Sequence, residues 1–397
     1  MVNLGLSLWF GMLIGCVTCQ QKIEMLKNAG LVSGEPQEIL FTSDFVERLD
    51  THLDSAVYEG ASAGAEAIIL IGGAIHYHQV AGFQTTIPRP VPLMLDTLFD
   101  LASLTKVVVT TTAIMMLVDR GEVELDSPAV AYLPGFKSNG KDEVTVLQLL
   151  SHTSGLPATK GLYRRHRGRV AFKKAIFDLE LDSVPGQERV YSDLGFMVLG
   201  WMIEEVSGKR LDRFAKEEIF EPLGMENTFY RPGIKERRRT AATEVCKWRK
   251  KLSQGEVHDE NAAALGGVAG HAGLFSTAYD LARFAQMILD NGTLEETRIL
   301  SEKAINTMLE RQPIPGCHIQ ALGWWYQRED GEPTLFLPSE HSFGHPGFTG
   351  TSIWIDPEYE AAVILLGNAI HPHREGADRD RLRKGFHAIV SEALGDL

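Results

Sequence analysis

The sequence of 397 residues predicts an α/β fold of the α+β type, with an antiparallel sheet flanked by helices and a second, all-helical lobe. Strand-like segments lie near both ends of the chain, while residues from about 125 to 270 show helices and loops without a strong strand pattern. The composition, 44% hydrophobic and 23% charged, is that of an ordinary globular protein. Strands from both ends can share one sheet, so we expect a cleft between this sheet and the helical middle.

The N-terminal part of this pattern contains a helix, a hairpin and a buried helix. The glycine pair at 72 and 73 joins two strand patterns, as in a hairpin. An apolar run that ends at Gly121 follows the next strand-like segment, and a helix that is apolar all round is buried. The predicted elements are the helix 45–58, the strands 65–71, 74–83 and 97–102, and the helix 107–118.

The C-terminal part returns to strands and closes with a helix. We expect a helix over 281–289 after the turn residues Ser276 and Thr277, strands over 323–327, 342–347, 352–356 and 361–367, and a last helix over 380–394. The expected catalytic domain therefore covers 41–395. Its sheet lobe would comprise about 41–125 and 270–395, and its helical lobe about 125–270.

The first 40 residues look like a leader and tether. Leu4–Val17 has the apolar length of a signal peptide and is short for a membrane span. The sequence Leu-Ile-Gly-Cys ending at Cys16 resembles a bacterial lipoprotein cleavage box, although no Lys or Arg precedes it. We therefore expect export to the periplasm or cell surface, with Cys16 as the candidate lipidation site and membrane attachment through that lipid.

Charge and cysteine content exclude several classes of protein. The net charge of −13 argues against a general nucleic-acid binder. Two basic clusters, 160–174 and 235–251, are either solvated faces or a basic rim that attracts an anionic substrate. The four cysteines are too scattered for a disulfide framework or a zinc site, and no phosphate-binding glycine loop is present. We expect no metal and no cofactor.

Ser103 and Lys106 open the buried helix and are the first candidate catalytic pair. Residues three apart share one helix face with Cβ atoms roughly 5–6 Å apart, so the lysine or its partner can take the serine proton. A second pair of the same spacing, Ser138 and Lys141, lies in a polar, glycine-containing stretch that predicts an exposed loop. The alternative for the first pair is an N-cap serine with a chance lysine.

Five stretches in a fixed order resemble the serine β-lactamase and penicillin-binding-protein superfamily, specifically its class C-like branch of carboxypeptidases, esterases and β-lactamases. They are Ser-Leu-Thr-Lys at 103–106, the stretch 149–157, Tyr-Ser-Asp-Leu-Gly-Phe at 191–196, the stretch 269–277, and His-Pro-Gly-Phe-Thr-Gly at 345–350. The resemblance covers about 45–395. It implies a sheet-and-helix lobe, a helical lobe and a site in the cleft between them.

The resemblance implies a role for each site residue. Ser103 would attack an ester or amide carbonyl and form an acyl-enzyme, and Tyr191 would pass the proton to the leaving group. The N–H groups of Ser103 and Phe348 would hold the oxyanion. Burial and the helix N-terminus both disfavour a charged Lys106.

Three residues depart from the family pattern. Asp193 stands where Asn is usual, so it only accepts hydrogen bonds when ionised; it could pair with Lys106 and leave Tyr191 as the base. His345, beside Gly347 on the late strand, replaces a lysine and is mostly neutral near pH 7. Pro346 replaces a hydroxyl residue and removes an N–H, which is tolerable if that N–H would have faced the cleft. Two groups that would bind a substrate carboxylate are therefore missing.

Other candidates are weaker. Ser154 lacks the preceding glycine of a nucleophile elbow. Residues 258–261 form either a substrate-binding loop at the cleft edge or a solvated turn, and His271 is expected to support a loop. We expect an exported serine hydrolase that acts on a D-alanyl peptide of peptidoglycan or on a small ester. The alternatives are a β-lactamase or a non-catalytic penicillin-binding sensor.

Overall fold

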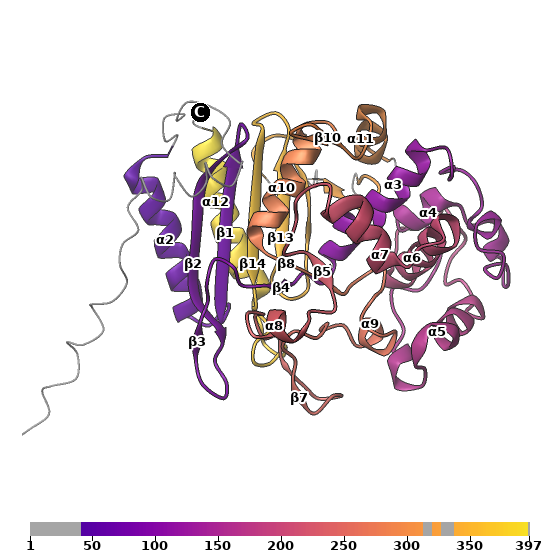
Figure 1. The fold of residues 1–397 in the computed structure, drawn as a ribbon, viewed down its shortest axis with the longest axis horizontal. Helices are drawn as coiled ribbons and strands as arrows, with labels where there is room; N and C mark the ends of the chain where they lie inside the picture. Colours follow the sequence, from indigo (N-terminus) through magenta and orange to yellow (C-terminus); the bar gives the residue numbers. More distant parts are fainter. Residues whose placement is uncertain (1–40, 313–319, 327–336, 396–397) are drawn as a thin grey trace, which may run out of the picture.

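A seven-stranded antiparallel sheet forms the centre of the protein in a computed structural model that describes residues 41–312, 320–326 and 337–395 (Figure 1). Its strand order is β11-β12-β13-β14-β1-β2-β3. The strands are β1 (Gly64–Ile71), β2 (Ala74–Thr85), β3 (Val91–Pro92), β11 (Trp325–Tyr326), β12 (Phe343–Pro346), β13 (Ser352–Asp356) and β14 (Ala361–Gly367). Strand β1 pairs with β14, so the predicted sheet built from both ends of the chain is confirmed.

Helices cover both faces of this sheet. Helices α2 (Ser43–Tyr58) and α12 (Arg379–Gly395) lie on one face, where Leu49 and Phe386 belong to one buried apolar cluster (Figure 1). Helix α10 (Ala278–Leu289) packs against β1 and β14 on the other face. Strand β1 is buried along its whole length because it is covered from both sides.

The predicted C-terminal elements agree closely with the structure. Strands β13 and β14 have the predicted bounds, and α12 is one residue longer at each end than predicted. Within the predicted strand 323–327, only β11 forms, and Gln327 lies outside the described residues. The hairpin β1–β2 turns at Gly72 and Gly73, which both have positive φ.

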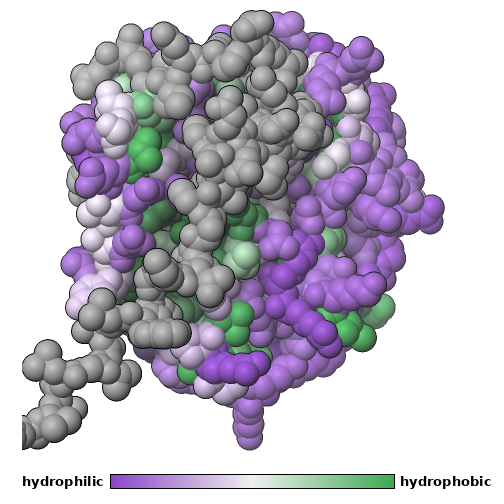
Figure 2. All heavy atoms as spheres, turned by 60° about the vertical axis from the view of Figure 1, so that its left-hand side comes forward, coloured by the Kyte–Doolittle hydropathy of each residue, from purple (hydrophilic) through white to green (hydrophobic). Residues whose placement is uncertain are grey.

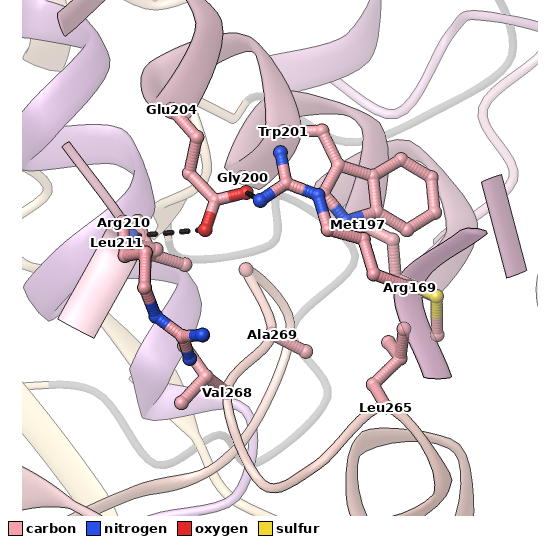
Figure 3. A pocket seen from close by; sticks show the side chains of 11 residues that line it. Arg169, Met197, Gly200, Trp201, Glu204, Arg210, Leu211, Leu265, Val268 and Ala269 are labelled. Atoms are coloured by element: carbon pink, nitrogen blue, oxygen red, sulfur yellow. Dashed lines mark hydrogen bonds and ion pairs between the residues drawn. The ribbon is translucent and has the colours of Figure 1, made fainter. Parts of the chain in front are cut away.

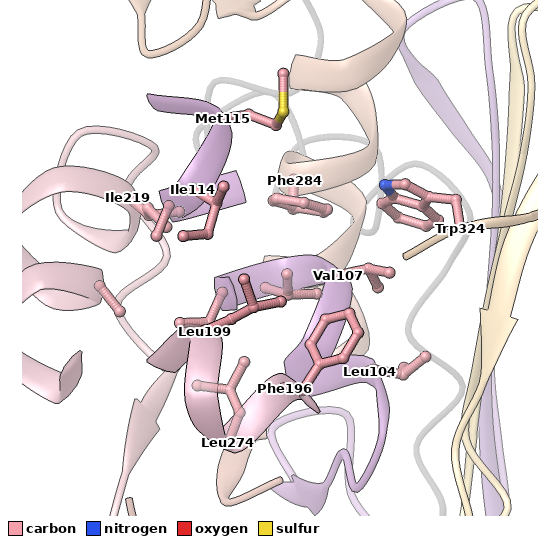
Figure 4. Packing of buried hydrophobic residues seen from close by; sticks show 14 of the residues in the cluster. Leu104, Val107, Ile114, Met115, Phe196, Leu199, Ile219, Leu274, Phe284 and Trp324 are labelled. Atoms are coloured by element: carbon pink, nitrogen blue, oxygen red, sulfur yellow. The ribbon is translucent and has the colours of Figure 1, made fainter. Parts of the chain in front are cut away.

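The helix that follows Ser103 is buried on every side, as predicted. Residues Lys106–Thr111 form a π-helix and α3 (Thr112–Asp119) continues it. Figure 4 shows this helix among side chains of α6 (Asp193–Ser207) and α10. The hydroxyl of Thr112 donates to the carbonyl of Val107 at 2.9 Å, five residues back, which matches the wider turn. The helix ends before Gly121, whose φ of +72° suits the end of a helix.

The middle of the chain, 125–270, is mainly helical, as predicted, although the short strands β5 (Phe229–Tyr230), β6 (Val245–Cys246) and β7 (Lys251–Leu252) also lie within it. Together with α6, its α-helices are α4 (Val146–Leu150), α5 (Gly168–Phe177), α7 (Leu211–Ala215), α8 (Ile234–Arg237) and α9 (Glu260–Ala264); α11 (Glu302–Leu309) follows later in the chain. The other short strands are β4 (Phe99–Asp100), β8 (Leu274–Ser276), β9 (Thr293–Leu294) and β10 (Thr297–Arg298). Strand β8 pairs with both β4 and β5.

The expectation of an exposed loop around Ser138 and Lys141 is wrong for the lysine. Lys141 is 0% exposed, and its ammonium lies 6.0 Å from the centroid of the Phe136 ring and donates to the carbonyl of Leu179. A long alkyl stem allows a lysine to be buried in this way. Ser138 is exposed, so the two residues do not form a second catalytic pair.

The described surface around α2, β2 and β3 is mainly hydrophilic, with scattered hydrophobic patches (Figure 2). Among the described residues, no helix is both long enough and apolar enough to cross a membrane. The predicted leader, including Cys16, lies outside the described residues.

Candidate active site

Ser103 lies where β4 passes into the buried helix. The preceding residue, Ala102, has a φ of +47°, which is strained for a residue other than glycine and costs about 1–3 kcal/mol. This backbone conformation turns the chain sharply and places Ser103 at the start of the helix. Ser103 lines a cavity of about 350 Å³ together with Tyr191, Asp193 and Phe348, so four of the predicted residues meet at one site.

Lys106 is fully buried beneath Ser103. Its ammonium donates to Ser103 Oγ at 3.1 Å, to Asp193 Oδ1 at 2.8 Å and to the carbonyl of His271 at 3.3 Å. These contacts match the three donors of an ammonium group. Burial alone would lower the pKa of Lys106, but the charge of Asp193 and the nearby Tyr191 outweigh burial and raise it. The predicted pairing with Asp193 is therefore present, and Lys106 is charged at neutral pH.

Tyr191 stands beside this pair. The Lys106 ammonium lies 4.7 Å from the centroid of the Tyr191 ring. Burial raises the pKa of Tyr191, and Lys106 offsets part of that rise. Helix α6 begins here, because Ser192 accepts a hydrogen bond from the N–H of Gly195 at 3.1 Å as its N-cap. The cap fixes the chain direction between Tyr191 and Asp193.

Three rings pack against Tyr191 and form an aromatic wall. Ring centroids lie 4.6 Å away for His152 and 5.9 Å away for both His345 and Trp325. The Nδ1 atom of His152 accepts the N–H of Ser192 at 3.0 Å, and burial lowers the pKa of His152 well below its usual value. The sequence analysis named neither His152 nor Trp325 as a site residue, although His152 lies in the stretch 149–157 that carries the resemblance.

His345 is neutral because its surroundings lower its pKa further below the ordinary value for histidine. The side chain is 1% exposed, and burial together with the charge of Lys106 lowers its pKa to about 3. Its Nδ1 atom lies 2.8 Å from the carbonyl oxygen of Pro346. The group that occupies the place of the family's lysine therefore carries no charge at physiological pH.

The end of β12 directs backbone N–H groups toward the cavity. The N–H of Gly347 donates to Thr351 at 2.6 Å, toward β13. Because successive N–H groups of an extended chain point to opposite sides, Pro346 and Phe348 direct their nitrogens away from β13. Strand β11 begins with Trp325 opposite Gly344 and does not extend to Pro346, so Pro346 removes no sheet hydrogen bond. Within the described residues, neither Ser103 nor Phe348 donates its N–H to a hydrogen bond, so both are available to an oxyanion.

Gly347 is required by close packing. A Cβ atom at this position would lie 2.7 Å from the carbonyl oxygen of Leu101 and 2.0 Å from Thr351 Oγ1. Only glycine allows the β12 end to approach the segment that carries Ser103.

The outer wall of the cavity surrounds the ring of Phe348. The His258 ring stacks on it with centroids 5.4 Å apart, and the guanidinium carbons of Arg379 and Arg374 lie 4.2 and 5.8 Å from its centroid. Arg374 binds the carboxylates of Glu244 and Glu260. These two carboxylates and Cys246 lie within 4.8 Å of one another, a spacing that could suit a metal, but both carboxylates already form ion pairs with the one guanidinium.

The weaker candidates from the sequence lie at different positions around the cavity. Ser154 is buried and accepts the N–H of Leu156 at 3.4 Å, and it is not among the residues that line the cavity. His271 lines the cavity and also supports its loop: a ring nitrogen lies 2.9 Å from Asp259 Oδ1, and its carbonyl accepts a hydrogen bond from Lys106. The loop 258–261 lines the cavity and is not a solvated turn.

The two basic clusters meet near the cavity. Lys160 lines the cavity and is exposed. Tyr163 from the first cluster packs edge-on against Trp248 from the second, with ring centroids 5.1 Å apart. The Trp248 ring also lies 5.0 Å from the guanidinium of Arg167. This grouping is compatible with a basic rim.

A smaller cavity of about 60 Å³ lies on the other side of the loop that holds Gly270. In Figure 3 the Glu204 carboxylate lies between Arg169 and the backbone of Leu211, with Ala269 facing them. This cavity holds none of the predicted site residues.

Residues 45–387 match the model of the family described as Beta-lactamase. The chain belongs to this family and is a serine hydrolase. It is 32% identical over 367 residues to a protein of Bacillus subtilis named N-acetylmuramyl-L-alanine amidase, covering 83% of this chain and 82% of that protein. A putative D-alanyl-D-alanine carboxypeptidase of Salmonella paratyphi B is 29% identical, covering 86% of each chain. A class C β-lactamase structure has the same fold, with a TM-score of 0.71 at 18% identity over 87% of this chain and 96% of that one.

Proposed function

We propose that the protein hydrolyses the amide bond between the lactyl group of N-acetylmuramic acid and L-alanine in peptidoglycan fragments, through an acyl-enzyme on Ser103. The observation that carries this proposal is the neutral, buried His345. A carboxypeptidase or β-lactamase must bind a free carboxylate close to the scissile bond, and a fixed cation serves that purpose. The muramyl amide is followed by further peptide, so it needs no cation there. The relative named N-acetylmuramyl-L-alanine amidase supports this choice.

In the proposed mechanism Lys106 stays charged and deprotonated Tyr191 is the base. The raised pKa keeps Lys106 as an ammonium, so its nitrogen has no lone pair to accept a proton. Ser103 Oγ bonds to the carbonyl carbon while its proton passes to the Tyr191 oxygen. The N–H groups of Ser103 and Phe348 bind the oxyanion. Collapse breaks the C–N bond, and Tyr191 returns the proton to the departing amine.

Water then completes the reaction. It attacks the ester carbon and gives its proton to Tyr191, and the proton moves on to Ser103 Oγ as the ester bond breaks. The products are N-acetylmuramic acid and a peptide with a free L-alanine amine. Since the pKa of Tyr191 is raised, the reactive form is a minor fraction at neutral pH and grows as pH increases.

A D-alanyl-D-alanine carboxypeptidase is the second candidate. The guanidinium of Arg379, 4.2 Å from the Phe348 ring centroid, is a different cation close to one of the residues whose N–H would bind the oxyanion. A substrate carboxylate that reached it would not need a charge at position 345. The relatives named putative D-alanyl-D-alanine carboxypeptidases favour this candidate as well.

The deciding experiment compares three substrates with purified protein and with Ser103→Ala. The substrates are N-acetylmuramyl-L-alanyl-D-isoglutamine, a diacetyl-L-lysyl-D-alanyl-D-alanine peptide and nitrocefin. Release of L-alanyl-D-isoglutamine by the wild type alone, with a trapped acyl adduct on Ser103, is the expected result. Release of D-alanine instead would support the second candidate. A fluorophosphonate adduct on Ser103 without turnover of the muramyl substrate would reject the amidase proposal.

Export and lipidation remain part of the proposal, because peptidoglycan fragments arise outside the cytoplasm. We expect the protein to incorporate labelled palmitate in its native host and Cys16→Ala to lose that label. A wild-type protein without label would contradict anchoring at Cys16, and cell fractionation would then test export alone.

A further inference from the structure

Asp100 is a buried residue that does not line the cavity but forms hydrogen bonds with the segments on two of its sides. It ends β4, three residues before Ser103, and is 2% exposed. Its Oδ1 atom accepts the N–H of Ala102 at 2.9 Å, and its Oδ2 atom accepts the N–H of His258 at 2.6 Å. Its own carbonyl accepts the hydroxyl of Thr349 at 2.7 Å.

Each partner in these hydrogen bonds adjoins or contacts Ser103 or Phe348, whose N–H groups would bind the oxyanion. Ala102 precedes Ser103 and has the positive φ of +47° at the turn into the helix. Thr349 follows Phe348 directly. His258 stacks its ring on that of Phe348 at 15° between the planes. One residue therefore connects the two segments whose N–H groups face the cavity.

The spacing of two oxyanion donors needs such a connection. An oxyanion hole works only when both N–H groups lie at hydrogen-bond distance from one developing charge. Ser103 starts a helix and Phe348 follows a strand of the sheet, so the packing of two different elements sets their separation. Buried, charge-assisted hydrogen bonds to a carboxylate are short and directional, which suits this task.

We infer that Asp100 is the positioning residue that sets the distance between the N–H groups of Ser103 and Phe348. The inference rests on the proposed acyl-enzyme function. Asp100 acts through Ala102, His258 and Thr349 and does not touch the substrate. Replacing its carboxylate should weaken oxyanion binding more than it weakens substrate binding.

The test variant is Asp100→Asn, which keeps the shape but turns one acceptor into an NH₂ group that faces an N–H. We expect kcat for an aryl ester to fall about 10- to 100-fold with KM changed less than twofold. The specific readout is the rate ratio between an aryl acetate and its thionoester. Sulfur accepts hydrogen bonds poorly, so a well-placed oxyanion hole gives a large ratio, and Asp100→Asn should reduce that ratio at least tenfold.

The matched control is Asp280→Asn. Asp280 is 1% exposed, and its carboxylate accepts the backbone N–H of Asn227 at 2.7 Å and the hydroxyl of Thr228 at 2.8 Å, but neither partner adjoins Ser103 or Phe348 in the chain. The Asp280→Asn variant should be less stable than the wild type but keep the wild-type rate ratio between the aryl acetate and its thionoester. A ratio in Asp100→Asn equal to that of the wild type or of Asp280→Asn would overturn the inference.

A second variant covers a failure of Asp100→Asn to fold. Thr349→Val keeps the branched shape and removes only the hydroxyl bond to the Asp100 carbonyl, so the ratio should fall by a smaller amount. An unchanged ratio in Thr349→Val, if Asp100→Asn does not fold, also overturns the inference. Absence of any acyl adduct on Ser103 in the wild type would reject the proposed function, and the inference with it. An adduct with unchanged ratios would reject the inference alone.

Discussion

A single residue, Asp193, sets the protonation of the catalytic pair. The usual Asn would leave Lys106 to burial, which lowers the pKa of a lysine. The carboxylate of Asp193 reverses this, because it bonds to Lys106 at 2.8 Å and its charge is the largest influence opposing burial. The same charge raises the pKa of Tyr191. The site therefore starts from a charged lysine and a neutral tyrosine.

Asp193→Asn should consequently shift the pH dependence of the reaction. Loss of the charge lowers the pKa of both Lys106 and Tyr191, so we expect the rising limb of kcat/KM to move about one unit to lower pH. The rate on a D-alanyl-D-alanine peptide should rise as well, because an amide can donate to the substrate carbonyl. The measurement is a pH–rate profile from pH 5 to 10. Glu260→Gln, which removes a cavity carboxylate that does not bond to Lys106, should leave the limb in place; equal shifts in both variants would contradict this account.

His345 is the residue that we expect to select against substrate carboxylates. His345→Lys places a cation there, and a hydrogen bond to a charged group contributes about 1.5–3 kcal/mol. The ratio of kcat/KM for the D-alanyl-D-alanine peptide over the muramyl substrate should rise about tenfold or more. His345→Met, which is similar in length and uncharged, provides the control. The explanation fails if Met raises the ratio as much as Lys does.

At the scale of elements, the loop 265–273 packs directly on the backbone of α6. A Cβ atom on Gly270 would lie 2.1 Å from the carbonyl oxygen of Phe196, and the Gly270 carbonyl accepts the hydroxyl of Thr110 at 2.6 Å. The next residue, His271, gives its carbonyl to Lys106. The contact between these two elements therefore supports the floor of the site.

Gly270→Ala should lower both stability and activity. The backbones must separate, so we expect a loss of about 1–3 kcal/mol in the free energy of unfolding and a fall in kcat. Gly195→Ala in α6 is the control, because its Cβ would have its nearest contact at 3.5 Å and alanine favours a helix by about 1 kcal/mol. Denaturant unfolding and steady-state kinetics measure both effects. Equal stability of the two variants would contradict the close-contact argument.

The elements also show what the sequence could predict. Short apolar runs and glycine turns predicted β1, β2, β13 and β14, because those signals are local in the sequence. The π-helix was not predictable, since β-branched Val107 and Thr111 favour a strand and only tertiary packing decides otherwise. For the site, by contrast, the order of the motifs correctly placed Ser103, Lys106 and Tyr191 close together. Asp100 and Trp325 were missed because their partners are distant in sequence and come together only through folding.

At the scale of the whole molecule, buried histidines make stability depend on pH. Burial lowers the pKa of His345 and His387 to about 3 and that of His371 to about 4. The unfolded chain binds a proton at each position below about pH 6.5, while the folded protein does not. Their contribution is therefore complete above pH 6.5 and is lost as the pH falls toward 3.

Each of these histidines should reduce stability by about 2 kcal/mol between pH 8 and pH 5. Asp280 acts in the opposite sense, because burial raises its pKa to about 6. The substitution His387→Gln removes the contribution of one buried histidine. Between pH 8 and pH 5, the free energy of unfolding of this variant should therefore fall by about 2 kcal/mol less than that of the wild type. Denaturant unfolding at both pH values gives the numbers. His341→Gln, at an exposed histidine, should behave as the wild type; a His387→Gln variant with the wild-type dependence would contradict the prediction.

The charge of the whole molecule gives the last prediction. A protein with net charge −13 repels anions on average, but Lys160 and Arg165 are exposed and belong to the basic cluster that reaches the cavity. If this cluster attracts an anionic muramyl peptide, kcat/KM for that substrate should fall as salt rises, because the Debye length shortens from about 30 Å at 0.01 M to about 8 Å at 0.15 M. A neutral aryl ester should show no such fall. Lys160→Gln combined with Arg165→Gln should flatten the salt dependence for the muramyl peptide and leave the ester rate unchanged, whereas equal slopes in wild type and variant would show that the basic cluster is only a solvated face.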